Sequence, residues 1–240
     1  MNADRRTRLG TLVVELARGS PATVDHVGAA VIAVAAVDAV AVVLALAATP
    51  RETVYVSGPL ASGLEDLAMT VGEGPSHDAM AAGPALVVDL TTADSAARWP
   101  AFAPAAVSAG VRAVFALPLW VGAIRLGVLD LYRAAPGALA GEALADVLVL
   151  ADMACALLLD GAQPDRPGGG DRVPERIALQ YPEVHQATGM ITVQLGVSAA
   201  VALIRLRAYA YAADRALRDV AGEVVARQLR FDPEPGDGGS

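Results

Sequence analysis

Lysine is missing from this chain of 240 residues, so all eighteen basic residues are arginines. Aromatic residues make up only 4% of the chain although 55% of it is hydrophobic, which predicts a core of Ala, Val and Leu. The single cysteine, Cys155, excludes an internal disulfide framework and fits a reducing cytoplasm. We expect it to pack in an apolar run rather than to sense redox state.

Catalytic motifs are absent as well. The sequence contains no P-loop, no Rossmann fingerprint and no HExxH motif. Its histidines, His26, His77 and His185, lie in separate segments without cysteine or carboxylate at metal-ligand spacing. We therefore expect no catalytic residue, no metal site and no cofactor, and we do not interpret the chain as an enzyme.

A secretory signal pattern is also lacking, because Glu15 and Arg18 interrupt the apolar run near the N-terminus. Residues 27–48 are long and apolar enough to cross a bilayer. Asp38 near the middle of that run would cost roughly 2.5–3.5 kcal/mol on insertion. We therefore divide it into a helix over 21–36 and a buried strand after Asp38, and expect a cytoplasmic protein without a membrane partner.

Strand and helix patterns alternate through the rest of the first 160 residues. We expect strands at 53–58, 86–90, 111–122 and 124–134, helices at 59–71 and 139–160, a turn with a short helix at 72–83, and an irregular helical stretch at 98–110. Gly122-Ala123 is a hairpin signal. The pattern predicts an α+β fold in which an antiparallel sheet has its helices gathered on one side.

Charge and composition divide the chain. We assign 1–160 to one domain, 161–174 to a Pro/Gly-rich linker, 175–231 to a helical module and 232–240 to a disordered acidic tail. Residues 1–171 carry a net charge of −8, whereas 172–230 hold eight arginines and five acidic residues, a net charge of +3. The positive charge is segregated, as nucleic-acid binding requires. It is also modest, so composition alone favours a merely solvated face over nucleic-acid binding.

The helical module reads as three short amphipathic helices. Gly196 followed by Ser198 indicates a helix end and a new N-cap, and Asp214 is the expected cap of the third helix. The expected apolar stripes are Val184, Ala187, Ile191 and Leu195; then Ala199, Ala202, Leu203, Leu206 and Ala210; then Leu217, Val220, Ala221 and Val224. Such helices bury these stripes against each other or against a partner.

The runs HQATGM, QLGVS, LRAYAY and LRDVA, in that order within 183–230, resemble the ANTAR module of bacterial transcription antiterminators. The resemblance implies a three-helix domain that binds stem-loop RNA. Many members carry lysine where Thr188 stands and methionine where Tyr211 stands. The candidate RNA-binding residues are His185, Gln186, Thr188, Gly189, Arg207, Arg215 and Arg218.

The larger domain resembles a GAF domain over residues 10–160. The resemblance is carried by the GEGP turn (72–75), Asp89-Leu90, Arg98-Trp99-Pro100 and the run GVLDLY (127–132). It implies a small-molecule sensor or dimerisation module whose ligand, if it has one, the sequence does not identify. Ser76 stands where relatives often place a cysteine, so thiol-based sensing is not expected there.

Together these patterns predict an RNA-binding transcription antitermination regulator in which a GAF-like sensor domain controls an ANTAR output module. The expected partners are structured stem-loop RNA, an unidentified small molecule, and a second copy of the chain. The homodimer prediction rests on helix 139–160, whose apolar stripe is wider than one sheet face needs. The alternative is a dimeric sensor or interaction protein whose helical module does not bind RNA.

Overall fold

The computed structural model describes residues 2–45, 51–161 and 181–232. Two compact units divide the chain: Met1–Glu65 with Glu73–Gln180, here the sheet domain, and Asp66–Gly72 with Tyr181–Ser240, here the helical module. The predicted linker 161–174 and the predicted tail 232–240 lie almost wholly outside the described residues.

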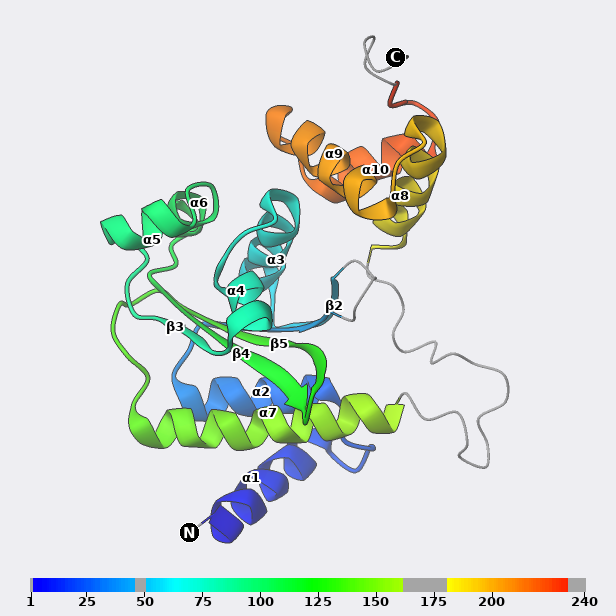
Figure 1. The fold of residues 1–240 in the computed structure, drawn as a ribbon. Coiled ribbons are helices and arrows are strands. Elements are labelled where there is room, and N and C mark those ends of the chain that lie inside the picture. Colours follow the sequence, from blue (N-terminus) through cyan, green and yellow to red (C-terminus); the bar gives the residue numbers. More distant parts are fainter. Residues whose placement is uncertain (1, 46–50, 162–180, 233–240) are drawn as a thin grey trace, which may run out of the picture. The chain divides into compact units, whose positions relative to one another are not determined.

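The sheet domain is built on five antiparallel strands in the order β2-β1-β5-β4-β3 (Figure 1). The strands are β1 (Ala39–Leu44), β2 (Glu52–Val56), β3 (Ala85–Val87), β4 (Ala113–Val121) and β5 (Ile124–Arg133). The hairpin predicted at Gly122-Ala123 joins β4 to β5, and Gly122 has the positive φ of 61° that such a turn needs. The predicted α+β fold with an antiparallel sheet is confirmed.

Helices lie on both faces of the sheet, so the expectation that they gather on one side was wrong (Figure 1). The helices that begin in this domain are α1 (Asn2–Ala17), α2 (Val24–Ala35), α3 (Pro59–Val71), α4 (Pro75–Ala82), α5 (Ala93–Arg98), α6 (Phe102–Ser108) and α7 (Gly141–Gly161). All six residues of β1 are buried, as are seven consecutive residues of β5 from Leu126 to Tyr132. Strands buried on both sides require cover on both sides.

One face of the sheet packs on α2 and α7, and Leu129 and Leu131 of β5 belong to this core. Helix α1, which the sequence patterns did not predict, covers part of α7: Arg5 Nε lies 2.8 Å from Asp146 Oδ1 and Arg8 Nη2 lies 2.7 Å from Asp146 Oδ2. Most of the apolar stripe of α7 is therefore buried within the chain, and Leu148, 47% exposed, is the large apolar side chain that it leaves outside.

Cys155 lies in this core, and burial raises the pKa of its thiol to about 11. The thiolate is the reactive form of cysteine, so the thiol stays protonated and unreactive near neutral pH. Its position agrees with the packing role expected from the apolar run MACALLL.

The opposite face carries α4 and the first part of α3, and the GEGP turn leads into α4. Glu73 Oε1 accepts hydrogen bonds from the backbone N–H groups of Ala101 (2.7 Å) and Phe102 (2.8 Å), at the start of α6. The indole Nε1 of Trp99 donates to Asp78 at 3.1 Å. Residues that carried the GAF resemblance thus tie the GEGP turn to the α5–α6 segment.

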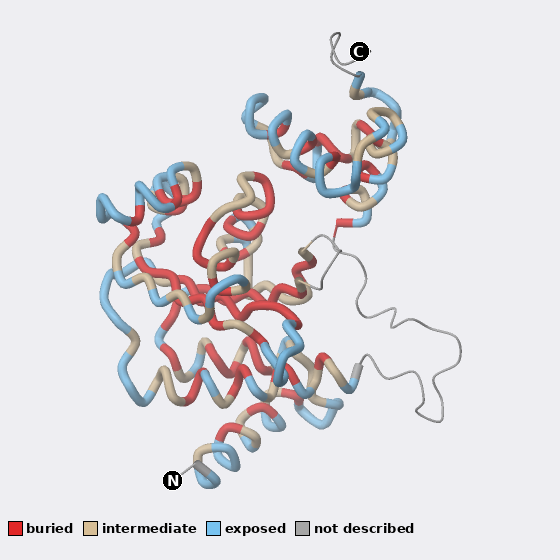
Figure 2. Tube along the Cα trace, in the orientation of Figure 1, coloured by how far each residue is buried: buried red, intermediate tan, exposed pale blue. Residues whose placement is uncertain are grey.

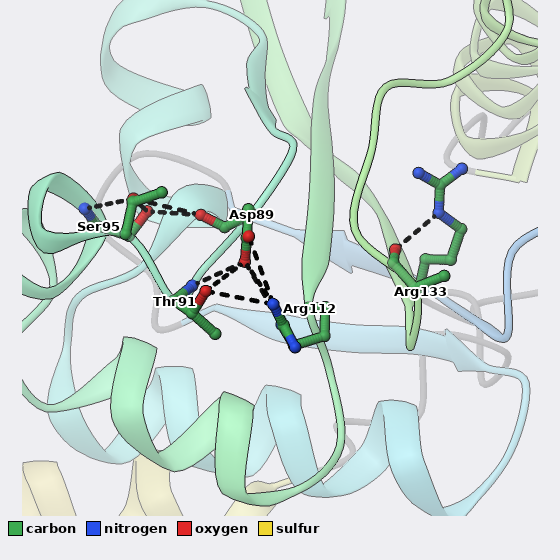
Figure 3. A network of polar contacts seen from close by, with 7 residues as sticks. Asp89, Thr91, Ser95, Arg112 and Arg133 are labelled. Carbon is green, nitrogen blue, oxygen red and sulfur yellow. Dashed lines mark hydrogen bonds and ion pairs between the residues drawn. The ribbon is translucent and has the colours of Figure 1, made fainter.

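Asp89 closes the turn between β3 and α5 (Figure 3). Its Oδ1 accepts from the Thr91 backbone N–H at 3.0 Å and from the Thr91 hydroxyl at 2.8 Å, and Arg112 lies 3.4 Å away. The hydrogen bonds from Thr91, assisted by Arg112, lower the pKa of Asp89 to about 2. Asp89 therefore caps the turn that follows β3.

Within the described ranges, no single helix is long and apolar enough to cross a membrane. Helices α8 (Pro182–Leu195) and α9 (Ala199–Ala212) satisfy that length and composition test only as a pair, and the pair is bent by 106°. Within the described residues, the apolar run at 27–48 forms most of α2, from Val27 to Ala35, and all of β1, as its division at Asp38 predicted.

Candidate nucleic-acid interface

The helical module contains α8, α9 and α10 (Leu217–Val225), as three helices were predicted. Pro182 occupies the first turn of α8, where its missing N–H is not needed, and Gly196 ends the helix in the left-handed region at φ 66°. The Ser198 hydroxyl accepts from the Val201 N–H at 3.3 Å and caps α9. Asp214 does not cap α10: it has φ 51°, and the N-cap position is Ala216.

The module encloses its own small core (Figure 2). Its fully or almost fully buried members are Val184, Ala187, Ile191, Ala202, Leu206, Ala210, Leu217, Val220, Ala221 and Val224. These are most of the predicted stripe residues, while Leu195 and Leu203 are partly buried against them and Ala199 is exposed. Because these stripes meet inside the module, its outer faces are left for solvent or a partner.

One outer face of α8 carries three of the predicted RNA-binding residues. Gln186 and Gly189 are exposed and His185 is half-buried, at helical spacings of three and four. A side chain added at Gly189 would meet no atom within 4 Å of its Cβ. Burial lowers the pKa of His185, so its imidazole is neutral at physiological pH and offers one donor and one acceptor.

Thr188 differs from its neighbours. Its side chain is buried, 6% exposed, and its hydroxyl donates to the Val184 carbonyl at 2.7 Å. A buried hydroxyl that is satisfied within its own helix cannot reach a phosphate. We therefore correct its assignment: Thr188 packs inside the module, where its apolar methyl group suits a core position.

Arg215 is engaged within the module. Its Nη1 and Nη2 lie 2.9 Å and 2.7 Å from the two carboxylate oxygens of Glu223, a two-pronged ion pair that joins the α9–α10 connection to α10. The hydrogen bonds from Arg215 lower the pKa of Glu223. The side chain is still 37% exposed, so phosphate contact would require it to share or leave this partner.

Arg207 and Arg218 contact the segment Asp66–Gly72, which belongs to the same unit. Arg207 Nε donates to the Met69 carbonyl at 2.8 Å. Arg218 lies 3.3 Å from Asp66 and 3.7 Å from Asp219, and 48% of its side chain is exposed. Of the three predicted arginines, Arg218 has the loosest contacts and the greatest exposure.

Exposed apolar side chains are a feature of the module that sequence reasoning did not assign to a site. Val193 of α8 is 84% exposed, and Ile204 and Tyr211 of α9 are 61% and 60% exposed. Val193 follows Gly189 at a spacing of four, and Tyr211 follows Arg207 at the same spacing, so each adjoins a predicted contact. The signal was present in the sequence, since these positions lie off the predicted stripes.

No protein-family model and no curated protein matches this chain. Among solved structures it is similar to a domain of a two-component sensor histidine kinase protein from Sinorhizobium meliloti 1021, with 17% identity over 55% of this chain and 86% of that one and a TM-score of 0.45. It is also similar to GAF3 of a Synechocystis sp. PCC6803 protein, with 14% identity over 65% of this chain and 94% of that one and a TM-score of 0.42.

A third similar structure is the chromophore-binding domain of a bacteriophytochrome from R. palustris, with 12% identity over 66% of this chain and a TM-score of 0.43. The matched part spans 59% of that bacteriophytochrome chain.

Proposed function

We propose that the helical module binds structured RNA and that the protein is a transcription antitermination regulator whose GAF-like sheet domain controls this module. The observation that carries the proposal is the separation of two sets of residues in α8 and α10. The apolar stripes close the core, while Gln186, Gly189 and Arg218, which the ANTAR resemblance assigns to RNA, stay exposed. A regulator of nascent RNA is expected in the cytoplasm.

The chemistry of the exposed residues suits an RNA loop. Arginine forks bind phosphate oxygens, and amide and imidazole groups bind the edges of unpaired bases. The exposed ring of Tyr211 offers a stacking surface for a base, which is worth about 1–3 kcal/mol in single-strand binders. Gly189 leaves α8 without a side chain at one point, where a backbone or a base can approach closely.

We predict that the full chain binds hairpin RNA in a salt-dependent manner and that Arg218→Ala weakens this binding. If three arginines neutralise one phosphate each, the slope of log affinity against log salt is roughly −2. Arg218→Ala should flatten it by about 0.7. Fluorescence anisotropy with a labelled hexaloop hairpin at several salt concentrations measures both quantities.

Arg98→Ala is the matched control, because Arg98 in α5 is also an exposed arginine next to a carboxylate, at 2.7 Å from Asp78. It removes the same charge from the sheet domain and should leave the slope unchanged. Gly189→Leu adds the second test: the module has room for this side chain, so lost affinity with an unchanged far-ultraviolet spectrum indicates close contact at α8. Equal losses of RNA affinity for Arg98→Ala and Arg218→Ala would mean unspecific charge attraction and would contradict the proposal.

The exposed apolar side chains favour a second candidate. The hydrophobic surface at Val193, Ile204 and Tyr211 is more than RNA binding alone requires. Exposed hydrophobic surface of this kind is typical of protein contacts. The protein would then be a sensor whose module docks a partner chain. Hairpin RNA that binds no better than unrelated RNA near physiological salt would favour this candidate over the antiterminator.

We further propose that the protein is a homodimer. The stripe of α7 that motivated this expectation is largely covered by α1 and α2. On these helices, Leu148 of α7 and Val14 of α1, 63% exposed, remain as large apolar side chains that a mate can contact. We expect Leu148→Glu to produce a monomer because it places a charge in the contact. Sedimentation of the wild type and of Leu148→Glu tests this proposal. A wild-type protein that is monomeric at micromolar concentration would contradict it.

A further inference from the structure

Polar side chains are buried together on the face of the sheet that α3 and α4 cover. Asp130 and Tyr132 come from the middle of β5, Glu65 from α3, Ser76 from α4, and Arg51 from the residue before β2. Asp130 is 0% exposed, Tyr132 1%, Glu65 3% and Ser76 4%, and Arg51 is half-buried. We call these five residues the polar cluster. Burying so many polar groups is costly unless each finds a partner.

Most atoms of the polar cluster are satisfied internally. The Tyr132 hydroxyl donates to Glu65 Oε1 at 2.6 Å, and the Ser76 hydroxyl donates to Asp130 Oδ2 at 2.6 Å. Arg51 Nη2 donates to the Ser76 oxygen. Ser76 therefore bridges Arg51 and Asp130, so the guanidinium and the carboxylate lie on either side of one hydroxyl.

Two atoms at this bridge have no hydrogen-bond partner among the described residues. They are Asp130 Oδ1, an acceptor, and Arg51 Nη1, a donor, and both are buried. Buried polar atoms in native proteins are nearly always paired, so an unpaired acceptor and an unpaired donor at one bridge point to a bound group that offers the complement of each. That complement is one donor beside one acceptor.

The charges of the polar cluster indicate which kind of donor group would bind at Asp130 Oδ1. The two carboxyl groups of Asp130 and Glu65 face one guanidinium, that of Arg51. Burial, followed by the charge of Glu65, raises the pKa of Asp130 well above its ordinary range, and Arg51 and Ser76 oppose this shift. A cation bound at Asp130 Oδ1 would oppose this shift in pKa and favour the ionised carboxylate. An anion would meet two carboxyl groups. A cationic donor therefore suits the polar cluster.

The neighbours of Asp130 in the sheet are small residues. Asp130 pairs with Ala41 of β1 and Ala116 of β4, and Ala79 of α4 packs on Ala116 and Val128. Cross-strand neighbours on one face lie close enough to touch, so short side chains here leave Asp130 bordered by methyl groups. A group that binds at Asp130 must therefore be compact.

We propose that the polar cluster binds a small primary amine that carries a neighbouring hydroxyl or carbonyl group. Its ammonium group donates to Asp130 Oδ1, and its oxygen accepts from Arg51 Nη1. The site lies wholly within the sheet domain and does not depend on whether the helical module binds RNA. It gives the sheet domain an input of defined chemistry: a short amino alcohol or amino amide.

Isothermal titration of the full chain tests the site with three probes of similar size. Ethanolamine supplies both groups, n-propylamine supplies the amine alone, and ethylene glycol supplies hydroxyls alone. We expect ethanolamine to bind with a dissociation constant of about 1–10 mM, near the limit for so few atoms. We expect n-propylamine to bind more weakly and ethylene glycol not to bind.

Two variants separate the two contacts. Asp130→Asn keeps the shape but removes the anion, and should lower ethanolamine affinity at least tenfold. Arg51→Gln should bring ethanolamine and n-propylamine to equal affinity while amine binding persists. Asp89→Asn, which removes a half-buried acid of the same domain outside the polar cluster, should bind ethanolamine like the wild type.

Folding of each variant is checked by tryptophan fluorescence, since Trp99 and Trp120 both lie in the sheet domain. A folded wild-type chain that binds no amine would mean that water or a shared proton satisfies the two atoms, and would overturn the proposal. Equal binding by Asp130→Asn would overturn it as well. Hairpin binding by the same samples reports separately on the RNA proposal.

Discussion

Gly127→Ala is expected to destabilise the sheet domain by about 3 kcal/mol or to prevent its folding. Gly127 lies in β5, paired with Leu44 of β1 and Leu119 of β4. A Cβ placed on it would lie 1.9 Å from the Val43 carbonyl oxygen, which is backbone and cannot rotate away. Either the β1–β5 ladder must separate or the strand must shift, and each breaks hydrogen bonds in the centre of the sheet. Urea unfolding followed by tryptophan fluorescence measures the loss.

Gly63→Ala is the control for this change. Gly63 is an exposed residue of α3, and an added Cβ would meet no atom within 4 Å. Alanine is the better helix former, so this variant should gain about 0.5–1 kcal/mol. A Gly127→Ala chain as stable as the wild type would show that the β1–β5 spacing at this point is looser than the structure describes.

The strands and most helices of the sheet domain could be predicted because each has a local signal. The hairpin at Gly122 followed from glycine chemistry, and β1 followed from an apolar run broken by Asp38. Helix α1 could not be predicted in this way, because its stripe, with Leu9, Val13 and Ala17 buried, is short and flanked by arginines. Its arginines become informative only once Asp146 of α7 is beside them.

The placement of helices on both faces required information that no single segment carries. In β5 the residues alternate between the core of α2 and α7 and the face of α4, yet Val128, Leu129 and Leu131 are equally apolar. The sequence of such a strand does not show which helices cover each of its two faces. Asp130 reads as a strand-end cap in the sequence, but its pairing with Ala41 and Ala116 places it in the middle of the sheet.

The candidate RNA site shows a similar division. Sequence spacing correctly identified the buried stripes of the helical module, because helical periodicity is a local property. It could not distinguish Thr188, which is buried, from Gln186, which is exposed two residues earlier. Nor could it show that Arg215 is held by Glu223, because the partner of a charged side chain depends on how α10 folds back.

Asp130 should make the sheet domain less stable as the pH rises. Its folded-state pKa is raised well above the unfolded value of about 3.9, chiefly by burial, so the folded chain holds a proton that the unfolded chain releases. Between these two pKa values the free energy of unfolding falls with pH, by at most about 1.4 kcal/mol per pH unit for one proton. Asp130→Asn removes the titration and should flatten this decline, with stability equal to or above the wild type at neutral pH.

Asp89→Asn is expected to change the acidic end of the profile of unfolding free energy against pH. The pKa of Asp89 is lowered to about 2, so its contribution is present above about pH 4 and is lost as the pH falls toward 2. Urea unfolding at a series of pH values, followed by the fluorescence of Trp99 and Trp120, separates the two carboxylates. A wild-type profile that stays level above pH 4 would mean that Asp130 is ionised at little cost, with Arg51 and Ser76 outweighing its burial. If instead Asp130→Asn gains stability and loses amine binding together, the buried carboxylate is retained at the expense of stability, as is expected of a residue kept for binding.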